Sequence, residues 1–314
     1  MSVWQPLAKN YMQRLESLIA SANAKLEPIT GSGSNRHYYR VVYPDGGSAV
    51  ATIGTNLAEN EAFLHLATTF ERAGLPVPVV TAVSEDRMVY VQQDLGNTSL
   101  CDCLARRDLV ARALTWLPRF QQVRGVDFGR CYPVAETDRR SVMWDLNYFK
   151  YCYLKLTGIE IDEPALEDDF ERLAEDVMAC EPWGFMYRDF QSRNVMICGD
   201  ETYFIDFQGG RRGPMLYDVV SFLWQARANA QLRPVRSAML KVYADAAGQD
   251  VALLERQLPS MVMFRMLQVL GAYGFRGLFE RKEAFLNSIP AAIDNIREFL
   301  PLSRYPYLTK IFQC

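Results

Sequence analysis

The sequence contains very little histidine and has no cysteine pair at the spacing of a metal site. Only two histidines, His37 and His65, and seven cysteines occur among its 314 residues, and no two cysteines form a C-x-x-C motif. Zinc centres use Cys and His at short, regular spacings, so a zinc site is not expected. Scattered thiols in odd number are typical of a reducing compartment, and we therefore predict a cytoplasmic protein.

Two further absences limit the partners. The net charge of -3 and the sequence pI of about 5.6 exclude a broad basic surface for nucleic acid. The opening residues, MSVWQPLAKNYMQ, lack a positive start followed by an apolar run, so no signal peptide is expected. The apolar stretch 261–279 is interrupted by Arg265, Gln268 and Arg276, which favours a core helix over a membrane span. We expect no nucleic acid and no membrane as partners, and the oligomeric state stays unpredicted.

The chain changes character near residue 95. At roughly 150 residues per domain, its length suggests two domains or lobes. After a first helix within residues 1–24, short β-rich runs and one helix follow; they cover residues 37–43, 48–53, 57–73 (the helix), 79–83 and 87–93. Beyond Leu95-Gly96-Asn97 most segments have helical periodicity. We predict an α+β fold with a small strand-rich lobe, 1–94, and a larger helical lobe, 95–314.

One segment interrupts the helical half. Residues 186–197 and 202–210 contain two apolar runs on either side of Cys198-Gly199-Asp200-Glu201, a pattern typical of a β-hairpin. With the turn centred near Asp200, Val195 is predicted to face Ile205, and Asn194 to face Asp206. A loop of a few residues then separates Asn194 from Asp189. This geometry predicts that two carboxylates and an amide oxygen lie close together.

Such a cluster of oxygen donors needs a cation. Oxygen ligands favour Mg²⁺, which prefers few protein ligands together with phosphate oxygens. We therefore expect Asn194 and Asp206 to hold Mg²⁺ on a nucleotide triphosphate. Asp189 is expected to orient and deprotonate an acceptor hydroxyl. An exposed hairpin whose acids are only solvated is the alternative, but the joint spacing of these residues favours the site.

These motifs resemble the kinase-like fold in its aminoglycoside phosphotransferase and choline kinase branch. Two segments are most similar in sequence to bacterial cell-wall sugar kinases that act on N-acetylmuramate and N-acetylglucosamine: residues 188–194, RDFQSRN, and residues 204–209, FIDFQG. The resemblance implies a bilobal protein-kinase-like fold with a small antiparallel sheet. It also implies that Asp189 is the catalytic base, that Asn194 and Asp206 bind the metal, and that Asp218 supports the catalytic loop from a following helix.

The sequence signals for the ATP-binding residues are weaker than those for the metal site. The resemblance implies that the loop over the ATP phosphates consists of Gly31, Ser32, Gly33 and Ser34. Glycines allow backbone N–H groups to approach phosphate oxygens. Arg36 can also donate to phosphate. The adenine is expected along Gln92–Gly96, next to Gln93 and Leu95, where backbone groups read it.

The sequence departs from the family at the third strand. Residues 48–53, SAVATI, contain no lysine where the family places the lysine that bridges the phosphates to a helix glutamate. The helix glutamate is expected as Glu61, facing solvent or paired with Arg36 or Arg40. Either another group neutralises the phosphates, which we favour, or the chain binds nucleotide without efficient catalysis.

The acceptor site is expected in the helical half. Three arginines are candidates for this site: Arg193, inside the loop, and Arg211 and Arg212, after the metal aspartate. They either hold the transferred phosphoryl group or an acceptor carboxylate, or they pair with acids such as Asp189 or Asp218 and fix the loop. Four aromatic residues either stack on a sugar ring or belong to the core: Trp144, Tyr148, Tyr151 and Tyr153. The acidic stretch 162–176 is interpreted as the solvated face of a helix.

The sequence thus predicts an enzyme that moves the γ-phosphoryl group of ATP to a hydroxyl of a small molecule, with Mg²⁺ as cofactor. An amino sugar of the N-acetylmuramate or N-acetylglucosamine type is the favoured acceptor. The alternatives are a nucleotide-binding pseudokinase or a kinase of aminoglycoside or choline-like acceptors. A protein kinase is disfavoured, because Pro214 and Asp218 follow Asp206 too closely for a long activation segment.

Overall fold

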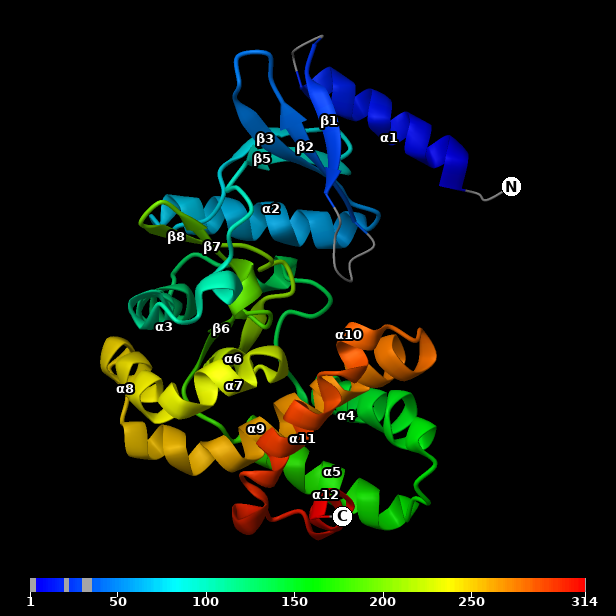
Figure 1. The fold of residues 1–314 in the computed structure, drawn as a ribbon, viewed down its shortest axis with the longest axis vertical. Coiled ribbons are helices and arrows are strands. Elements are labelled where there is room, and N and C mark those ends of the chain that lie inside the picture. Colours follow the sequence, from blue (N-terminus) through cyan, green and yellow to red (C-terminus); the bar gives the residue numbers. More distant parts are fainter. Residues whose placement is uncertain (1–3, 20–22, 30–35, 314) are drawn as a thin grey trace. The chain divides into compact units, whose positions relative to one another are not determined.

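A computed structural model describes residues 4–19, 23–29 and 36–313, with the side chains of residues 4–9 excepted (Figure 1). The chain forms two compact units. The sheet unit consists of Met1–Leu100, Val123–Ala135 and Arg193–Gly210, and the helical unit of Cys101–Gln122, Glu136–Ser192 and Arg211–Cys314. The sequence predicts one division after residue 94, whereas the sheet unit also includes two later segments.

The sheet unit contains one antiparallel sheet of five strands in the order β1-β2-β3-β5-β4. The strands are β1 (Lys25–Ile29), β2 (His37–Val42), β3 (Ser48–Ile53), β4 (Val80–Val83) and β5 (Val89–Gln93). The four predicted strand runs are all present. The sequence analysis missed β1, which contains Pro28; a proline has no N–H to donate, and β1 tolerates it because it lies at the edge of the sheet.

Helices cover both faces of this sheet. Leu15 and Ile19, at the end of α1 (Trp4–Leu18), belong to the same apolar core as Val89 and Val91 of β5. On α2 (Leu57–Arg72), Phe63 stacks on Tyr90 with ring centroids 4.6 Å apart. Successive side chains of a strand point to opposite faces, so these contacts place α1 and α2 on opposite sides of the sheet.

The predicted hairpin exists as β7 (Val195–Cys198) and β8 (Glu201–Phe204) and belongs to the sheet unit. Ile197 donates its backbone N–H to Thr98 at 2.9 Å, and Phe204 donates to Pro76 at 2.8 Å. These bonds tie the hairpin to the segment before β4 and to the segment after β5.

The predicted register of this hairpin is wrong by one residue. Val195 pairs with Phe204 instead of Ile205. The turn is a two-residue turn, Gly199-Asp200, in which Gly199 has a φ of +62°. A glycine with positive φ at the first turn position closes a tight hairpin, so the centre of the turn lies between Gly199 and Asp200 and not at Asp200.

The helical unit contains most of the helices. They are α3 (Arg107–Gln121), α4 (Arg139–Cys152), α5 (Glu163–Met178), α6 (Leu216–Leu223), α7 (Asn229–Leu232), α8 (Arg236–Ala247), α9 (Val251–Tyr273), α10 (Glu283–Leu286), α11 (Ile289–Arg297) and α12 (Pro306–Gln313). A two-stranded sheet of β6 (Trp183–Met186) and β9 (Arg211–Pro214) lies among them. The predicted α+β fold class, with a small antiparallel sheet and a larger helical part, is therefore confirmed.

The long apolar stretch is a core helix, as predicted. Residues 261–268 of α9 are all buried. Among the described residues, no helix combines the length and the low polarity that a membrane crossing requires.

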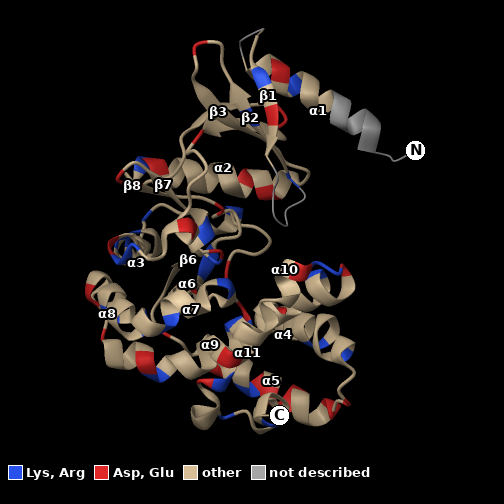
Figure 2. Ribbon diagram, in the orientation of Figure 1, with Lys and Arg blue, Asp and Glu red and all other residues tan. Residues whose placement is uncertain are grey.

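The acidic stretch differs from its prediction at two positions. Most of the acids on α5, red in Figure 2, are exposed or half-buried, but Asp169 is fully buried and accepts the backbone N–H groups of Tyr307 and Leu308. Asp176 accepts the hydroxyl of Tyr305 at 2.6 Å. These bonds fix the C-terminal segment against α5, for which the helical pattern alone gives no signal.

Candidate functional site

A buried aspartate supports the loop that carries Asp189. Asp218, on α6, has no exposed surface and accepts the backbone N–H groups of Tyr187 and Arg188, each at 2.8 Å. The side chain of Gln121 donates a third hydrogen bond at 3.0 Å. Arg188 has a φ of +74°, a strained value for a residue with a side chain. Asp218 therefore holds the backbone in this conformation just before Asp189.

Burial controls the protonation of Asp218. It raises the pKa of Asp218 to about 7, against the opposing effect of the three donated hydrogen bonds. The folded protein consequently binds a proton at Asp218 between pH 4 and 7 that the unfolded chain has released. Stability from this group is fully present below about pH 4 and is lost as the pH rises towards 7.

We expect Asp218→Asn to lower the free energy of unfolding by about 1–3 kcal/mol, because one buried N–H loses its acceptor. The deficit relative to wild type should shrink between pH 4.5 and pH 8, since only the wild type loses stability as Asp218 ionises. Urea unfolding at several pH values measures this difference. A deficit that grows with pH would contradict the assigned shift.

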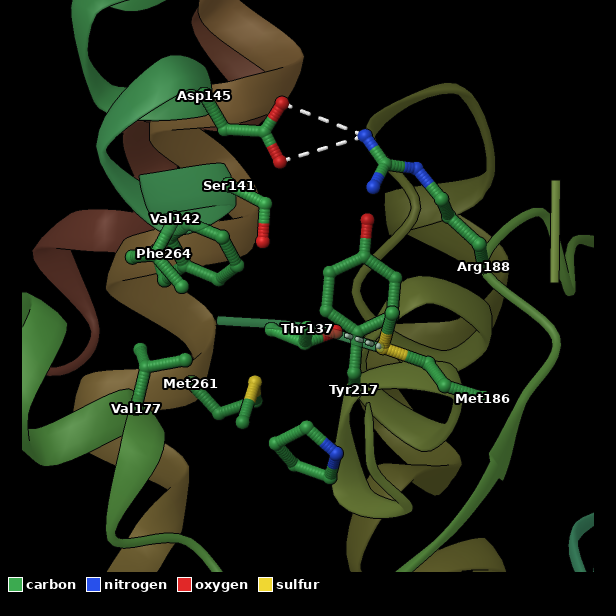
Figure 3. A pocket seen from close by; sticks show the side chains of 11 residues that line it. Thr137, Ser141, Val142, Asp145, Val177, Met186, Arg188, Tyr217, Met261 and Phe264 are labelled. Atoms are coloured by element: carbon green, nitrogen blue, oxygen red, sulfur yellow. Dashed lines mark hydrogen bonds and ion pairs between the residues drawn. The ribbon is translucent and has the colours of Figure 1, made fainter. Parts of the chain in front are cut away.

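An ion pair joins the same loop to α4. Nη2 of Arg188 lies 3.3 Å from both carboxylate oxygens of Asp145, and Gln268 donates to Asp145 at 2.7 Å. Figure 3 shows this pair at one end of a small pocket, with the hydroxyl of Tyr217 directed towards the Arg188 guanidinium. These contacts fix Arg188, the residue directly before Asp189, against α4 and α9.

Asp189 follows these fixed residues and is half-buried. Its neighbours Tyr187 and Phe190 are buried, and their rings make an edge contact with centroids 5.4 Å apart. The ring of Tyr187 thus packs beneath the loop. The carboxyl group that we predict to act as base therefore stands on a rigid support.

The two predicted metal ligands lie together in the sheet unit. Nδ2 of Asn194 donates to Oδ2 of Asp206 at 3.2 Å, and Gln208 donates to the other carboxylate oxygen at 2.9 Å. Asp206 has a φ of +68°, so the chain leaves strand geometry there. This backbone turn brings the Asp206 side chain beside Asn194 although the hairpin register differs from the prediction. Arg193 is half-buried in the same 3-10 turn, Ser192–Asn194.

An aromatic contact fixes Asp206. The next residue, Phe207, is buried; its ring stacks on Phe63 at 5.2 Å and meets the edge of Phe70 at 5.1 Å, both on α2. The residue after Asp206 is therefore anchored to α2, the helix that also carries Glu59 and Glu61.

The donor set fits a hard cation. Asn194 and Asp206 offer an amide oxygen and carboxylate oxygens, which are the ligands Mg²⁺ accepts in small number when phosphate oxygens complete its shell. Within the described part of the chain, no group of three or more His, Cys, Asp and Glu is arranged for a metal. A site of this kind would thus depend on the nucleotide for its remaining ligands.

On the nucleotide side, Gly31, Ser32, Gly33 and Ser34 lie outside the described residues. Arg36 is described and nearly buried, with 4% of its side chain exposed, and its Nη2 lies 3.0 Å from Oε1 of Glu59 on α2. Burial by itself lowers the pKa of Arg36. Tyr90, Tyr38 and Glu59 more than offset this effect, so the net shift of the pKa is upward and the guanidinium stays charged.

The strand register locates this cation. Tyr38 and Tyr90 are the two neighbours of Thr52 across the sheet, and Tyr38 is also a hydrogen-bond partner of Arg36. The guanidinium therefore lies beside β3, the strand that lacks the family lysine. A buried arginine paired with a half-buried glutamate thus stands close to where a lysine–glutamate pair is expected.

Glu61, the glutamate named from the sequence, has other partners. It pairs with Arg87 at 2.8 Å and with Arg130 at 3.5 Å, and Arg40 pairs with Asp94 at 2.6 Å. Neither of the pairings considered for Glu61, with Arg36 or Arg40, is present. Two residues along a helix correspond to a rotation of about 200°, so Glu59 faces Arg36 while Glu61 faces away.

Hydrogen bonds hold the segment that is expected to contact the adenine. Gln93, in β5, donates its backbone N–H to Val79 at 2.8 Å, and the carbonyl of Leu95 accepts from the thiol of Cys198. The described residues around Gln93 and Leu95 thus connect the sheet directly to the β7–β8 hairpin.

The comparisons with known proteins decide the family. The model of the phosphotransferase enzyme family matches residues 25–254. The chain belongs to this family. As a phosphotransferase of this family, it is a small-molecule kinase, and the predicted resemblance is confirmed.

One curated relative and two solved structures are similar to this chain. A curated N-acetylmuramate/N-acetylglucosamine kinase of Neisseria meningitidis serogroup B is 24% identical over 280 residues, covering 83% of this chain and 81% of the relative. A choline/ethanolamine kinase family protein of Mesorhizobium loti has a TM-score of 0.63 at 15% identity and covers 97% of this chain and 98% of its own. The amicoumacin kinase hAmiN, in complex with AMP-PNP, Ca²⁺ and Ami, has a TM-score of 0.62 at 14% identity, with 95% of each chain covered. The predicted kinase-like fold is confirmed.

The sequence analysis missed several residues that shape the site. Asp145 lies 43 residues from Arg188 in the chain, and Gln121 lies 97 residues from Asp218. Neither belongs to a local motif, so no spacing rule could have identified them. For Glu59, the only available signal was its presence on the same helix as Glu61.

Proposed function

We propose that this phosphotransferase moves the γ-phosphoryl group of ATP to a hydroxyl of an amino sugar of the N-acetylmuramate or N-acetylglucosamine type. One observation carries the proposal: the Asn194–Asp206 pair follows, within a few residues, a loop that Asp218 holds in a strained conformation. The curated relative, which is a kinase of both sugars, supports the acceptor class.

The proposed roles follow from the chemistry of each side chain. Asn194 and Asp206 hold Mg²⁺, which neutralises charge on the phosphate oxygens when it is bound. Asp189 accepts the proton of the acceptor hydroxyl. Arg193 donates hydrogen bonds to the transferred phosphoryl group, for which a guanidinium is well suited.

The nucleotide is proposed to bind along the sheet unit. Backbone N–H groups of Gly31, Ser32, Gly33 and Ser34 cover the phosphates, and backbone groups near Gln93 and Leu95 receive the adenine. Arg36, oriented by Glu59, supplies the positive charge that the absent lysine would supply, because its buried guanidinium lies beside β3. ATP and a small-molecule acceptor are the proposed partners, and a cytoplasmic location goes with the supply of ATP there.

A second candidate function rests on the missing lysine of β3. A chain without this lysine could bind nucleotide and regulate a partner without transferring phosphate. The Arg36–Glu59 pair favours the enzyme over this alternative, since it keeps a cation and a helix glutamate together.

Turnover with a panel of acceptors tests the proposal. We expect Mg²⁺-dependent ADP release that requires N-acetylmuramate or N-acetylglucosamine and is absent with choline, ethanolamine or an aminoglycoside. Release with one of the latter compounds alone would move the acceptor to another branch of the family. Saturable ATP binding without acceptor-dependent release from any of them would establish the regulatory module instead.

A further inference from the structure

Three aromatic residues form an exposed row on α4. Trp144, Tyr148 and Tyr151 are spaced by four and three residues, so they lie on one helix face, while Val142, Leu146 and Phe149 of the same helix are fully buried. The exposed fractions of the three are 51%, 37% and 56%. The sequence left open whether these rings belong to the core, and their exposure excludes that interpretation.

The row begins beside the loop that carries Asp189. Asp145 directly follows Trp144 and precedes Tyr148 by one helical turn, and its carboxylate is the partner of Arg188. Arg188 is in turn the neighbour of Asp189 in the chain. The Trp144 end of the row is therefore connected to the proposed base through one ion pair and one peptide unit, all within the helical unit.

A π-helix forms the surface next to the row. Gly274–Phe279 follows α9 directly and has π-helical geometry, a feature that often marks a functional site. Gly271, one turn before it, lets α9 approach α4: a Cβ atom there would lie 2.9 Å from Cδ1 of Tyr148. The ring of Tyr148 is thus fixed against α9.

Polar groups adjoin this aromatic surface. Burial raises the pKa of the Tyr148 phenol; through their charges, Arg276 lowers it and Glu280 raises it. Nη1 of Arg276 lies 3.1 Å from both carboxylate oxygens of Glu280. Ligand sites for small polar molecules combine aromatic area with a few such donors and acceptors. The combination suits the hydroxyl and amide groups of an amino sugar.

The two ends of the row differ. Lys150 and Lys155 lie over the ring of Tyr151, at 5.5 and 5.3 Å from its centroid, and both lysines are held by acids of α5. Among the described residues, no ring or cation stacks on Trp144. The indole of Trp144 is therefore the ring with an open face, and it is the one next to Asp145.

We propose that Trp144 and Tyr148 form the acceptor subsite, in which the apolar C–H face of the sugar ring packs on the two aromatic rings while a hydroxyl is presented to Asp189. This inference rests on the proposed function, and it goes further by naming the side chains that recognise the acceptor. Stacking on Trp144 needs no charge on the acceptor, so it suits the sugar ring that N-acetylmuramate and N-acetylglucosamine share.

Steady-state kinetics of Trp144→Ala test the subsite. We expect the KM for the amino sugar to rise by roughly five- to thirteenfold, as loss of an aromatic contact of about 1–1.5 kcal/mol implies, with the KM for ATP within twofold of wild type. Trp144→Phe, which keeps an aromatic face, should restore most of the affinity. Tyr151→Ala is the matched control, since it removes an exposed ring of the same helix and should leave both constants unchanged.

Three results would overturn the subsite. They are an unchanged acceptor KM in Trp144→Ala, an equal rise in Tyr151→Ala, or an equal rise in the KM for ATP. A wild-type dimer that Trp144→Ala dissociates without change in acceptor KM would show that a second copy covers this face. Failure of the proposed function has a different signature, namely no amino-sugar turnover by the wild type, and the subsite would fall with it.

Discussion

Replacement of Asp189 by asparagine is expected to lower kcat by about 10²–10⁴-fold, the usual contribution of a positioned base. The carboxylate would be lost, but the Asp218 bonds to the preceding backbone would remain, so the loop should keep its conformation. We therefore expect ATP affinity to change little. Turnover of an amino sugar, with ATP affinity measured separately by calorimetry, distinguishes the two effects.

A matched control is available on α5. Asp168 is exposed and belongs to the same helical unit, so Asp168→Asn makes the same chemical change away from the loop. Its kcat should equal that of wild type. If Asp189→Asn retained kcat within a few-fold of wild type, Asp189 could not be the base.

Removal of the Arg36 charge should act on the nucleotide instead of the acceptor. Hydrogen bonds to charged groups contribute about 1.5–3 kcal/mol, so Arg36→Met should raise the KM for ATP by roughly 10–150-fold. Arg36→Lys should recover part of this loss, because it keeps the charge but not the planar fork of donors. The KM for the amino sugar should be nearly constant across these variants.

Glu59 and Glu61 allow a further comparison on the same helix. Glu59→Gln should raise the KM for ATP more than Glu61→Gln, because only Glu59 contacts Arg36. Arg87→Met serves as the control, since it breaks only the exposed pair with Glu61. Wild-type ATP kinetics in Arg36→Met would show that another group replaces the lysine.

Local patterns in the sequence were sufficient to predict many of the strands and helices. The β-rich runs 37–43 and 48–53 correctly predicted β2 and β3, the second with its observed bounds. The pairing of β6 with β9 was not predicted, because Trp183 and Pro214 pair across a long stretch of chain that no turn signal connects. Edge strand β1 was missed because Pro28 suggests a break.

The site was predictable in its residue types and less so in its geometry. Asn194 and Asp206 do lie together, yet through the positive φ of Asp206 and not through the assumed strand register. A one-residue slip in register reverses the faces of a strand, so sequence alone could not fix their contact. The partner of Arg36 depends on how α2 is rotated, which is set by the packing of Phe63 and Phe70 and not by any local motif.

A phosphorus-31 spectrum of the reaction mixture tests the central claim most directly. Wild-type protein with ATP, Mg²⁺ and N-acetylmuramate or N-acetylglucosamine should convert the γ-phosphate signal into a sugar phosphate signal, in equal amount to the ADP formed. The same mixture with Asp189→Asn should show little conversion in the same time. A spectrum in which ATP stays intact, or yields inorganic phosphate alone, would contradict phosphoryl transfer to an amino sugar.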